Sequence, residues 1–190
     1  MVEVSGQLKT IAVSLMKIAN DLRWLNSGPR CGIGEITLPS LQPGSSIMPG
    51  KVNPVIPESV MMICATVIGN DTAITIGGQH GNFELNTMMP MMAYHLLESI
   101  RLLTKGVRNL VDRCINGIVA NKERAASLIE NSLAMATALA PKIGYDAAAK
   151  IAQEAYATGK TVRQVAMEQK VLPEQELERV LDPMRQTFGE

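Results

Sequence analysis

The chain has 190 residues, of which 46% are hydrophobic, and its 18 basic and 18 acidic side chains give a formal net charge of zero. This apolar content is sufficient for a packed core, which excludes a disordered chain. The lack of a basic excess argues against a nucleic-acid-binding protein and against one held on a membrane surface by basic residues.

The cysteines Cys31, Cys64 and Cys114 are too few and too widely spaced for a disulfide framework or a clustered zinc site. We expect them to be buried thiols in a reduced compartment. The predicted location is therefore cytoplasmic, or mitochondrial if the source is eukaryotic. The chain does not open with a basic segment followed by an apolar run, so no signal peptide is expected.

The opening segment carries apolar residues at alternating steps of four and three, the spacing of one face of a long helix. This stripe predicts a helix that ends near residues 26–29, where glycine and proline stop it. Because Met1 stands almost directly at the start of the stripe, we expect the chain to be the later part of a larger protein. The stripe consists of Val4, Leu8, Ile11, Leu15, Ile18, Leu22 and Leu25.

A stretch rich in glycine, proline and serine follows at residues 30–53. Loops of this length are uncommon in compact domains and are often functional. A helix is then expected to begin at Pro54 or Pro57, and Asn53 is in place to cap the first of these starts.

This helix is expected to run to about residue 76 and to break at Gly77 and Gly78. A further helix is predicted over about 83–116, with a bend near Pro90, which removes one backbone donor.

Residues 59–97 carry only two formal charges, on Asp71 and Glu84. The uncharged runs within them are shorter than the ~20 residues that a membrane span requires. Helices that are apolar on all sides are typical of the interior of a large soluble assembly. We therefore predict a homo-oligomer with no membrane segment.

Shorter helices are predicted after residue 121, where the charge density rises. An Ala-rich helix should end at Gly159, Thr161 and Gln164 have the spacing of a capping box, and Pro173 should open a last helix near residues 174–181. No β-alternation extends beyond a few residues. The predicted fold is all-α, with a long-helix bundle over residues 1–120 and a small C-terminal helical domain over residues 121–190.

Residues 44–54 read Gly-Ser-Ser-Ile-Met-Pro-Gly-Lys-Val-Asn-Pro and bring hydroxyls, an ammonium and an amide toward a helix N-terminus. Such a terminus favours anions, so a small carboxylate or phosphate would bind well there. The alternative is an ordinary loop ahead of a capped helix. The glycine spacing and the Lys-Ser/Thr pair of a phosphate-binding P-loop are absent.

The same segment resembles the signature loop of the fumarase/aspartase superfamily, SSxMPxKxNP. The Ser-Gly-Pro-Arg-Cys-Gly run at 27–32, the Gly-Asn-Phe-Glu-Leu-Asn run at 81–86 and Ile-Gly-Tyr-Asp at 143–146 also resemble class II fumarate hydratases. Gly50 is the choice usual in fumarases, whereas aspartases usually carry Ala there. The resemblance covers the whole chain but only about the last two-fifths of a family protein.

The resemblance implies a role for each matching residue. Ser45 corresponds to the base that removes the C3 proton of malate and leaves an aci-carboxylate. Lys51 and Asn53 correspond to residues that hold the substrate carboxylate, and Ser46 and the Val52 backbone to further substrate contacts. Glu58 corresponds to the acid that pairs with a catalytic histidine of a neighbouring subunit.

The chain departs from the family in lacking the upstream segment that carries this histidine. We expect His80 to be a turn or helix-end residue and His95 a satisfied buried or interface histidine, and neither to be catalytic. The fragment alone is therefore expected to be inactive.

The resemblance implies a lyase that hydrates fumarate reversibly to (S)-malate in the tricarboxylic acid cycle. It implies no metal and no other cofactor, a small dicarboxylate as substrate, and a tetramer in the complete protein, whose central helical domain would include residues 1–120. An aspartate ammonia-lyase or another superfamily lyase is the alternative enzyme. A non-catalytic helical oligomerisation fragment is the alternative of another class.

Overall fold

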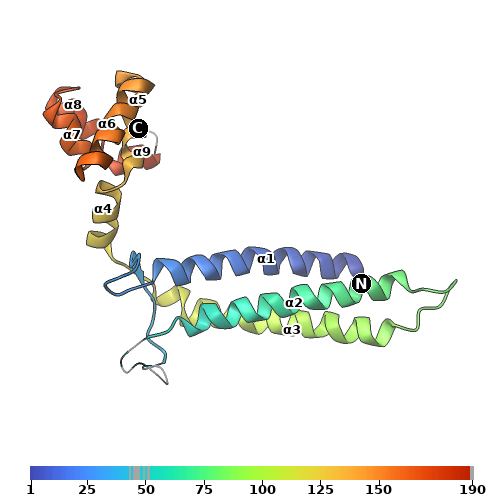
Figure 1. Cartoon of the computed structure of the whole chain (residues 1–190). Coiled ribbons are helices and arrows are strands. Elements are labelled where there is room, and N and C mark those ends of the chain that lie inside the picture. The colour runs from blue at the N-terminus through green and yellow to red at the C-terminus, as the bar shows by residue number, and fades with distance from the viewer. Residues whose placement is uncertain (43, 45–47, 49, 51, 189–190) are drawn as a thin grey trace. The chain divides into compact units, whose positions relative to one another are not determined.

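A computed structural model describes residues 1–42, 44, 48, 50 and 52–188 of the chain (Figure 1). The chain divides into two compact units, Met1–Asn121 and Lys122–Glu190. Both units are built almost entirely from helices, which confirms the predicted all-α class.

Three long helices make up most of the first unit: α1 (Val2–Leu25), α2 (Val55–Gln79) and α3 (Met89–Arg113). They lie side by side and alternate in direction, so that the end of α1, the start of α2 and the end of α3 meet at one end of the bundle (Figure 1). At that end two short strands, β1 (Ile36–Thr37) and β2 (Val119–Ala120), form an antiparallel pair. The 3-10 turn η1 (Ile115–Gly117) connects α3 to β2. The sequence did not predict these strands, because two residues are too few to show an alternating pattern.

Small side chains allow the helices of this bundle to pack closely. Ser5, Ala12 and Ala19 recur every seven residues on α1 and are the buried residues of that helix. Gly106 of α3 approaches α2 so closely that a Cβ there would lie 2.7 Å from Cδ1 of Ile63. The main cluster of buried apolar residues in the unit consists of Ala12, Ala19, Leu38, Val60, Cys64, Val67, Leu103, Leu110 and Cys114.

The apolar stripe predicted on α1 divides between two environments. Leu8, Leu15 and Leu22 pack against the core, whereas Val4, Ile11 and Ile18 of the same stripe are about half exposed. The cause is that α1 packs mainly on α2 and has little contact with α3. One half of the stripe is therefore only partly covered by the described residues of this chain.

Helix α2 continues through Gly77 and Gly78 to Gln79, so the predicted break is wrong. A Cβ at Gly77 would lie 2.6 Å from Cγ of Met92 on α3, and one at Gly78 would lie 2.6 Å from Cγ2 of Val2 on α1. The glycines allow this close approach. Packing on two sides compensates for the ~1 kcal/mol by which each glycine disfavours a helix.

The next helix begins at Met89 rather than near Phe83, and Pro90 stands in its first turn instead of bending its interior. Proline is tolerated there because the first turn leaves its backbone N–H groups unpaired. Asn86 accepts a hydrogen bond from the Met88 N–H at 2.8 Å and donates one to the Gly77 carbonyl at 2.9 Å. It thereby connects the end of α2 to the start of α3.

An ion pair between the part-exposed Lys9 and the buried Asp71 joins α1 to α2. Asp71 is 4% exposed, and its carboxylate accepts hydrogen bonds from Lys9 Nζ at 2.6 Å and Ser5 Oγ at 2.7 Å. Burial by itself would raise the pKa of Asp71, but the hydrogen bonds from Lys9 and Ser5 and the charge of Lys9 outweigh it and hold the pKa below its ordinary value. Asp71 is therefore ionised at neutral pH.

A second polar cluster joins α2 to α3. Asn70 Nδ2 donates to Ser99 Oγ at 3.1 Å, and Asn70 Oδ1 lies 2.8 Å from His95 Nδ1. Ser99 donates in turn to the His95 carbonyl at 2.8 Å. His95 is thus a hydrogen-bonded, part-buried residue of the bundle, as expected, and His80 is the C-cap of α2, a helix-end residue.

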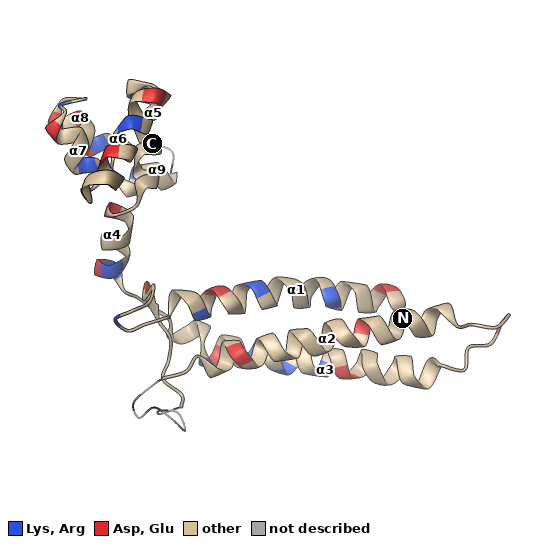
Figure 2. Ribbon diagram, viewed as in Figure 1, with Lys and Arg blue, Asp and Glu red and all other residues tan. Residues whose placement is uncertain are grey.

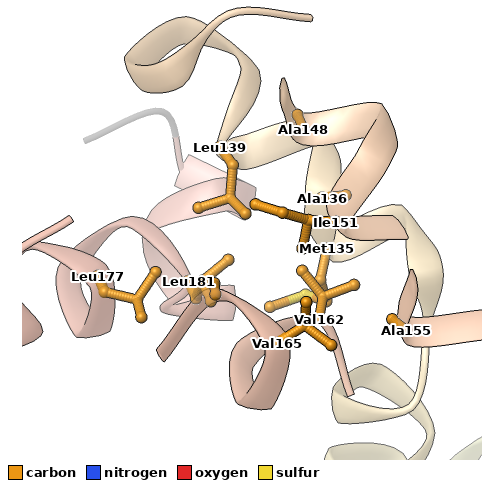
Figure 3. Packing of buried hydrophobic residues seen from close by; sticks show 11 residues of the cluster. Met135, Ala136, Leu139, Ala148, Ile151, Ala155, Val162, Val165, Leu177 and Leu181 are labelled. Atoms are coloured by element: carbon orange, nitrogen blue, oxygen red, sulfur yellow. The ribbon is translucent and has the colours of Figure 1, made fainter. Parts of the chain in front are cut away.

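The second unit consists of short helices around a core of its own: α4 (Lys122–Glu130), the 3-10 helix η2 (Leu133–Ala138), α5 (Ala140–Ile143), α6 (Tyr145–Thr158), α7 (Val162–Glu168), α8 (Glu174–Val180) and α9 (Pro183–Phe188). Figure 3 shows the apolar side chains that meet between η2, α6, α7 and α8. The predicted capping box of Thr161 and Gln164 and the predicted end of α6 at Gly159 are confirmed, and Gly159 adopts a left-handed conformation. A helix after α8 was not expected.

Charged residues are sparse on α2 (Figure 2). This helix is long and apolar enough to cross a membrane, by length and composition alone, and 39% of its most apolar window is buried in the structure. A core helix of a soluble protein meets the same criterion.

Two of the three cysteines are buried, as expected: Cys64 and Cys114, whose thiol pKa is raised by burial. Cys31 is exposed, contrary to expectation.

Lys9→Met is expected to lower the free energy of unfolding at pH 7 by about 1–2 kcal/mol, because it leaves the buried Asp71 carboxylate without its charged donor. A carboxylate whose pKa is lowered in the folded state stabilises that state at pH values above the pKa of the unfolded chain, about 3.9 for aspartate. This stabilisation is lost as the pH falls through the pKa of the folded state. In urea denaturation, the difference in the free energy of unfolding between the unchanged chain and Lys9→Met should therefore be smaller at pH 3 than at pH 7. Lys17→Met removes an exposed pair with Asp21 and should change stability by less than about 0.5 kcal/mol. Equal effects of the two substitutions would show that Asp71 does not depend on Lys9 for its stabilisation.

Gly77→Ala should destabilise the chain by about 1–3 kcal/mol, because the new methyl group would overlap the Met92 side chain. Gly69→Ala provides the matched control in the same helix, since no atom lies within 4 Å of a Cβ placed there. The control should be neutral or stabilising by up to about 1 kcal/mol. Thermal unfolding followed by circular dichroism compares the two, and equal stabilities would show that the close contact is unimportant.

Candidate functional site

The predicted site residues belong to the loop that leads into α2 and to the first turn of that helix. Val52 and Asn53 precede the helix, and Glu58 lies in its first turn. Ser45, Ser46 and Lys51 lie outside the described residues. The predicted cap is wrong, because α2 begins after Pro54 without a side-chain cap and the Asn53 carbonyl instead accepts a hydrogen bond from the Val55 N–H at 2.9 Å.

A cavity of about 330 Å³ opens where the end of α1 meets the start of α2. It is large enough for a small organic acid, and its wall brings together Val52, Asn53 and Glu58, three of the predicted residues. The wall consists of Arg23, Trp24, Asn26, Ser27, Gly28, Val52, Asn53, Pro54 and Glu58.

Arg23 and Glu58 form an ion pair across this cavity, with 3.8 Å between Nε and Oε1. The guanidinium is held from the other side, because Nη1 donates to Asn20 Oδ1 at 3.3 Å and lies 3.7 Å from Met61 Sδ. Within the described part of the chain, Arg23 Nε is buried and has no hydrogen-bond partner. The positive end of the α2 dipole also favours the negative charge of Glu58 in the first turn.

The turn after α1 forms one edge of the cavity. Ser27 Oγ donates to the Trp24 carbonyl at 2.6 Å and accepts from the Ile33 N–H at 3.0 Å. A Cβ at Gly32 would lie 2.3 Å from the Ser27 carbonyl, so the turn requires glycine there. These contacts explain why serine and glycine stand at 27 and 32, before the loop.

Two asparagines hold the chain beyond that turn. Asn26 Oδ1 accepts from the Leu38 N–H at 2.9 Å. Asn121 donates to the Gly34 carbonyl at 2.8 Å and accepts from Thr37 Oγ1 at 3.1 Å. The segment before the loop is therefore hydrogen-bonded both to the C-cap residue of α1 and to the last residue of the unit.

Neither histidine lines the cavity. His80 lies at the far end of α2, and His95 is hydrogen-bonded to Asn70 within the bundle. Among the residues that the structure describes, no three His, Cys, Asp or Glu side chains come together as potential metal ligands.

Sequence reasoning missed Arg23 and Trp24 as residues of this site. A basic residue in the last turn of a helix has a sufficient explanation in the helix dipole, and nothing in the sequence indicates that it meets a carboxylate 35 positions later. The contact arises only because α1 and α2 pack antiparallel with their ends aligned.

Comparison with known proteins agrees with the fold. Residues 1–69 match the lyase family, and residues 135–187 match the family described as the fumarase C C-terminus. The class II fumarate hydratase of Xylella fastidiosa (strain Temecula1) is 54% identical over 189 residues, which are 100% of this chain and 40% of that protein. The chain thus spans about two-fifths of the length of the curated relatives that it matches.

Solved structures give the same result. The class II fumarase of Schistosoma mansoni is 38% identical, with a TM-score of 0.94 over 100% of this chain and 40% of that one. The fumarate lyase:delta crystallin of Brucella melitensis, bound to cobalt, is 54% identical, with a TM-score of 0.89 over 97% of this chain and 40% of that one. The chain therefore belongs to the fumarase family of lyases and corresponds to a C-terminal portion of the class II fumarate hydratases.

Proposed function

We propose that the chain provides the C-terminal two-fifths of a fumarate hydratase, which adds water reversibly to fumarate to give (S)-malate in the tricarboxylic acid cycle. The observation that carries the proposal is the cavity beside the signature loop, with Asn53 and Glu58 in its wall, in a chain 54% identical to a class II fumarate hydratase. A small dicarboxylate is the substrate class.

In this proposal Ser45 removes the C3 proton of malate, and the electron pair left behind is delocalised into the adjacent carboxylate as an aci-carboxylate. A serine hydroxyl is a weak base, so the surrounding N–H groups and the ammonium of Lys51 must stabilise its alkoxide. Lys51 and Asn53 hold the carboxylate as its charge grows. Ser46 and the Val52 backbone make further substrate contacts.

Glu58 has a different part in the reaction. It pairs with a histidine of a neighbouring subunit, orients the ring and raises its basicity, so that the ring can exchange a proton with the water that is lost or added. The C3–H and C2–O bonds of malate break, and fumarate and water are the products. The proposal requires no metal or other cofactor.

Assembly is part of the same proposal, because the site takes residues from more than one subunit. Val4, Ile11 and Ile18 of α1 and Leu97 and Val111 of α3 are exposed in the single chain. Packing these faces against further copies would bury them, and a tetramer is the assembly we propose for the complete protein. We place it in the cytoplasm, or in mitochondria if the source is eukaryotic, with no nucleic-acid or membrane partner.

Ser45→Ala should abolish turnover while leaving assembly intact. The variant is made in a full-length hybrid in which this chain follows the preceding three-fifths of the Xylella fastidiosa relative. Fumarate formation from malate is read by ultraviolet absorbance, and the expected loss is at least about 100-fold, because general-base catalysis contributes that much or more. Light scattering checks the assembly.

Ser40→Ala is the matched control, since Ser40 is an exposed residue of the same loop, and its turnover should equal that of the unchanged hybrid. Unchanged turnover in Ser45→Ala would overturn the role of Ser45. Formation of fumarate from aspartate instead of malate would move the assignment to an aspartate ammonia-lyase. Tetramers that act on neither substrate would favour the non-catalytic alternative.

Ile11→Glu should shift the 190-residue chain from oligomer toward monomer in light scattering, because it places a charge on the exposed apolar face of α1. Thr10→Glu, one position along the helix and also exposed, should leave the mass unchanged. Circular dichroism should show the same helix content for both. A well-folded monomer for the unchanged chain at micromolar concentration would contradict the assembly proposal for this 190-residue chain.

A further inference from the structure

We infer that Arg23 is a positioning residue that holds the Glu58 carboxylate in the orientation its reaction requires. The inference rests on the proposed function, because Glu58 has its role there. Arg23 lies 35 positions before Glu58 and is outside the signature loop on which the resemblance depends.

The cavity wall supports this pairing. Within its described lining, Arg23 and Glu58 are the charged side chains, and the other residues are apolar, small or neutral polar. Their side chains are 37% and 41% exposed, so the pair stands at the rim, where water competes for each group. At such a position an ion pair adds a modest amount to stability, and its main value lies in geometry.

The guanidinium is itself held in place. Asn20 accepts a hydrogen bond from Nη1 on one side, and Met61 of α2 lies against the same nitrogen. Arg23 therefore contacts both α1 and α2, and its Nε lies nearest to Glu58 Oε1. The planar guanidinium presents its donors in fixed directions, which suits it to orient a carboxylate.

The unpaired Nε of Arg23 is the observation that indicates a hydrogen bond to Glu58 during the reaction. It is buried and without a hydrogen-bond partner among the described residues, and the nearby acceptor is Glu58 Oε1 at 3.8 Å. A charge-assisted N–H···O bond is about 2.7–2.9 Å long, so a movement of about 1 Å by the carboxylate would close it. Hydrogen bonds of catalytic groups are often long before the complex forms and shorten within it.

The two carboxylate oxygens of Glu58 can then act separately. One oxygen accepts from Arg23 Nε, and the other remains available for the neighbouring subunit's imidazole. Held by Arg23, the carboxylate cannot rotate away from that ring, and the ring keeps the angle at which it meets the water. Arg23 acts on the reaction only through Glu58, because Ser46, Lys51, Val52 and Asn53 provide the substrate contacts.

A double-mutant cycle in the hybrid enzyme tests the inference. Arg23→Met should lower kcat about 10- to 100-fold, the cost of a displacement of about 1 Å, with KM changed less than about threefold. In the Glu58→Gln background the same substitution should change kcat less than about twofold, since an effect exerted through Glu58 is lost with it. Arg23→Lys, which keeps the charge but not the planar donors, should recover part of the activity. Arg101→Met breaks an exposed pair with Glu98 on α3 and should leave kcat unchanged.

An equal loss of kcat from Arg23→Met in both backgrounds would overturn the inference, because a general structural defect does not depend on Glu58. So would an unchanged kcat. The melting temperature of the 190-residue chain gives a second cycle that needs no activity, and Arg23→Met should lower it more with Glu58 present than with Gln there. Additive shifts would refute the contact. An inactive unchanged hybrid with a coupled melting-temperature cycle would reject the proposed function and leave the contact standing.

Discussion

The burial of α2 between two neighbouring helices is the constraint on which the rest of the first unit depends. Along its length α2 contacts α1 on one side and α3 on the other. Its buried polar residues are hydrogen-bonded to these neighbours: Asp71 to Ser5 and Lys9 of α1, and Asn70 to Ser99 of α3. A buried carboxylate without a donor is costly, so a shift of α2 by one turn would lose both sets of bonds at once. Gly77 allows the close approach at the far end. The axial position of α2 is therefore set by its middle, and the positions of its two ends follow from it.

That position brings the first turn of α2 beside the last turn of α1, where the cavity forms and Arg23 meets Glu58. The segment between the two helices is held independently. Asn26 bonds to the Leu38 backbone, Asn121 to Gly34 and Thr37, and β1 pairs with β2. The signature loop thus starts and ends on fixed supports, as expected of a binding loop carried by a rigid scaffold. The chemistry we propose for Ser45, Lys51 and Asn53 uses this framework, and Glu58 and Arg23 belong to it directly.

The surface of the same bundle indicates why the site and the assembly belong together. Half of the α1 stripe and several apolar residues of α3, among them Leu97 and Val111, remain exposed in the single chain. A helix whose apolar residues extend beyond one face is suited to more neighbours than this chain supplies. In the proposed tetramer those neighbours would also bring the histidine that Glu58 needs. Burial of apolar surface and completion of the active site would then be a single event.

The sequence by itself determined the all-α class, the extent of α1, the capping box at Thr161 and the family, because each depends on local spacing or on a contiguous motif. It failed at Gly77 and Gly78, where propensity predicts a break but packing against Met92 and Val2 keeps the helix intact. It failed at Pro90 because the hydrogen bonds of Asn86 delay the start of α3. In the candidate site, the family resemblance predicted Val52, Asn53 and Glu58, which line one cavity, whereas Arg23 and Trp24 carried no signal. Only the tertiary structure placed Arg23 and Trp24 in the cavity wall, because the contact between positions 23 and 58 forms only when α1 and α2 pack with their ends aligned.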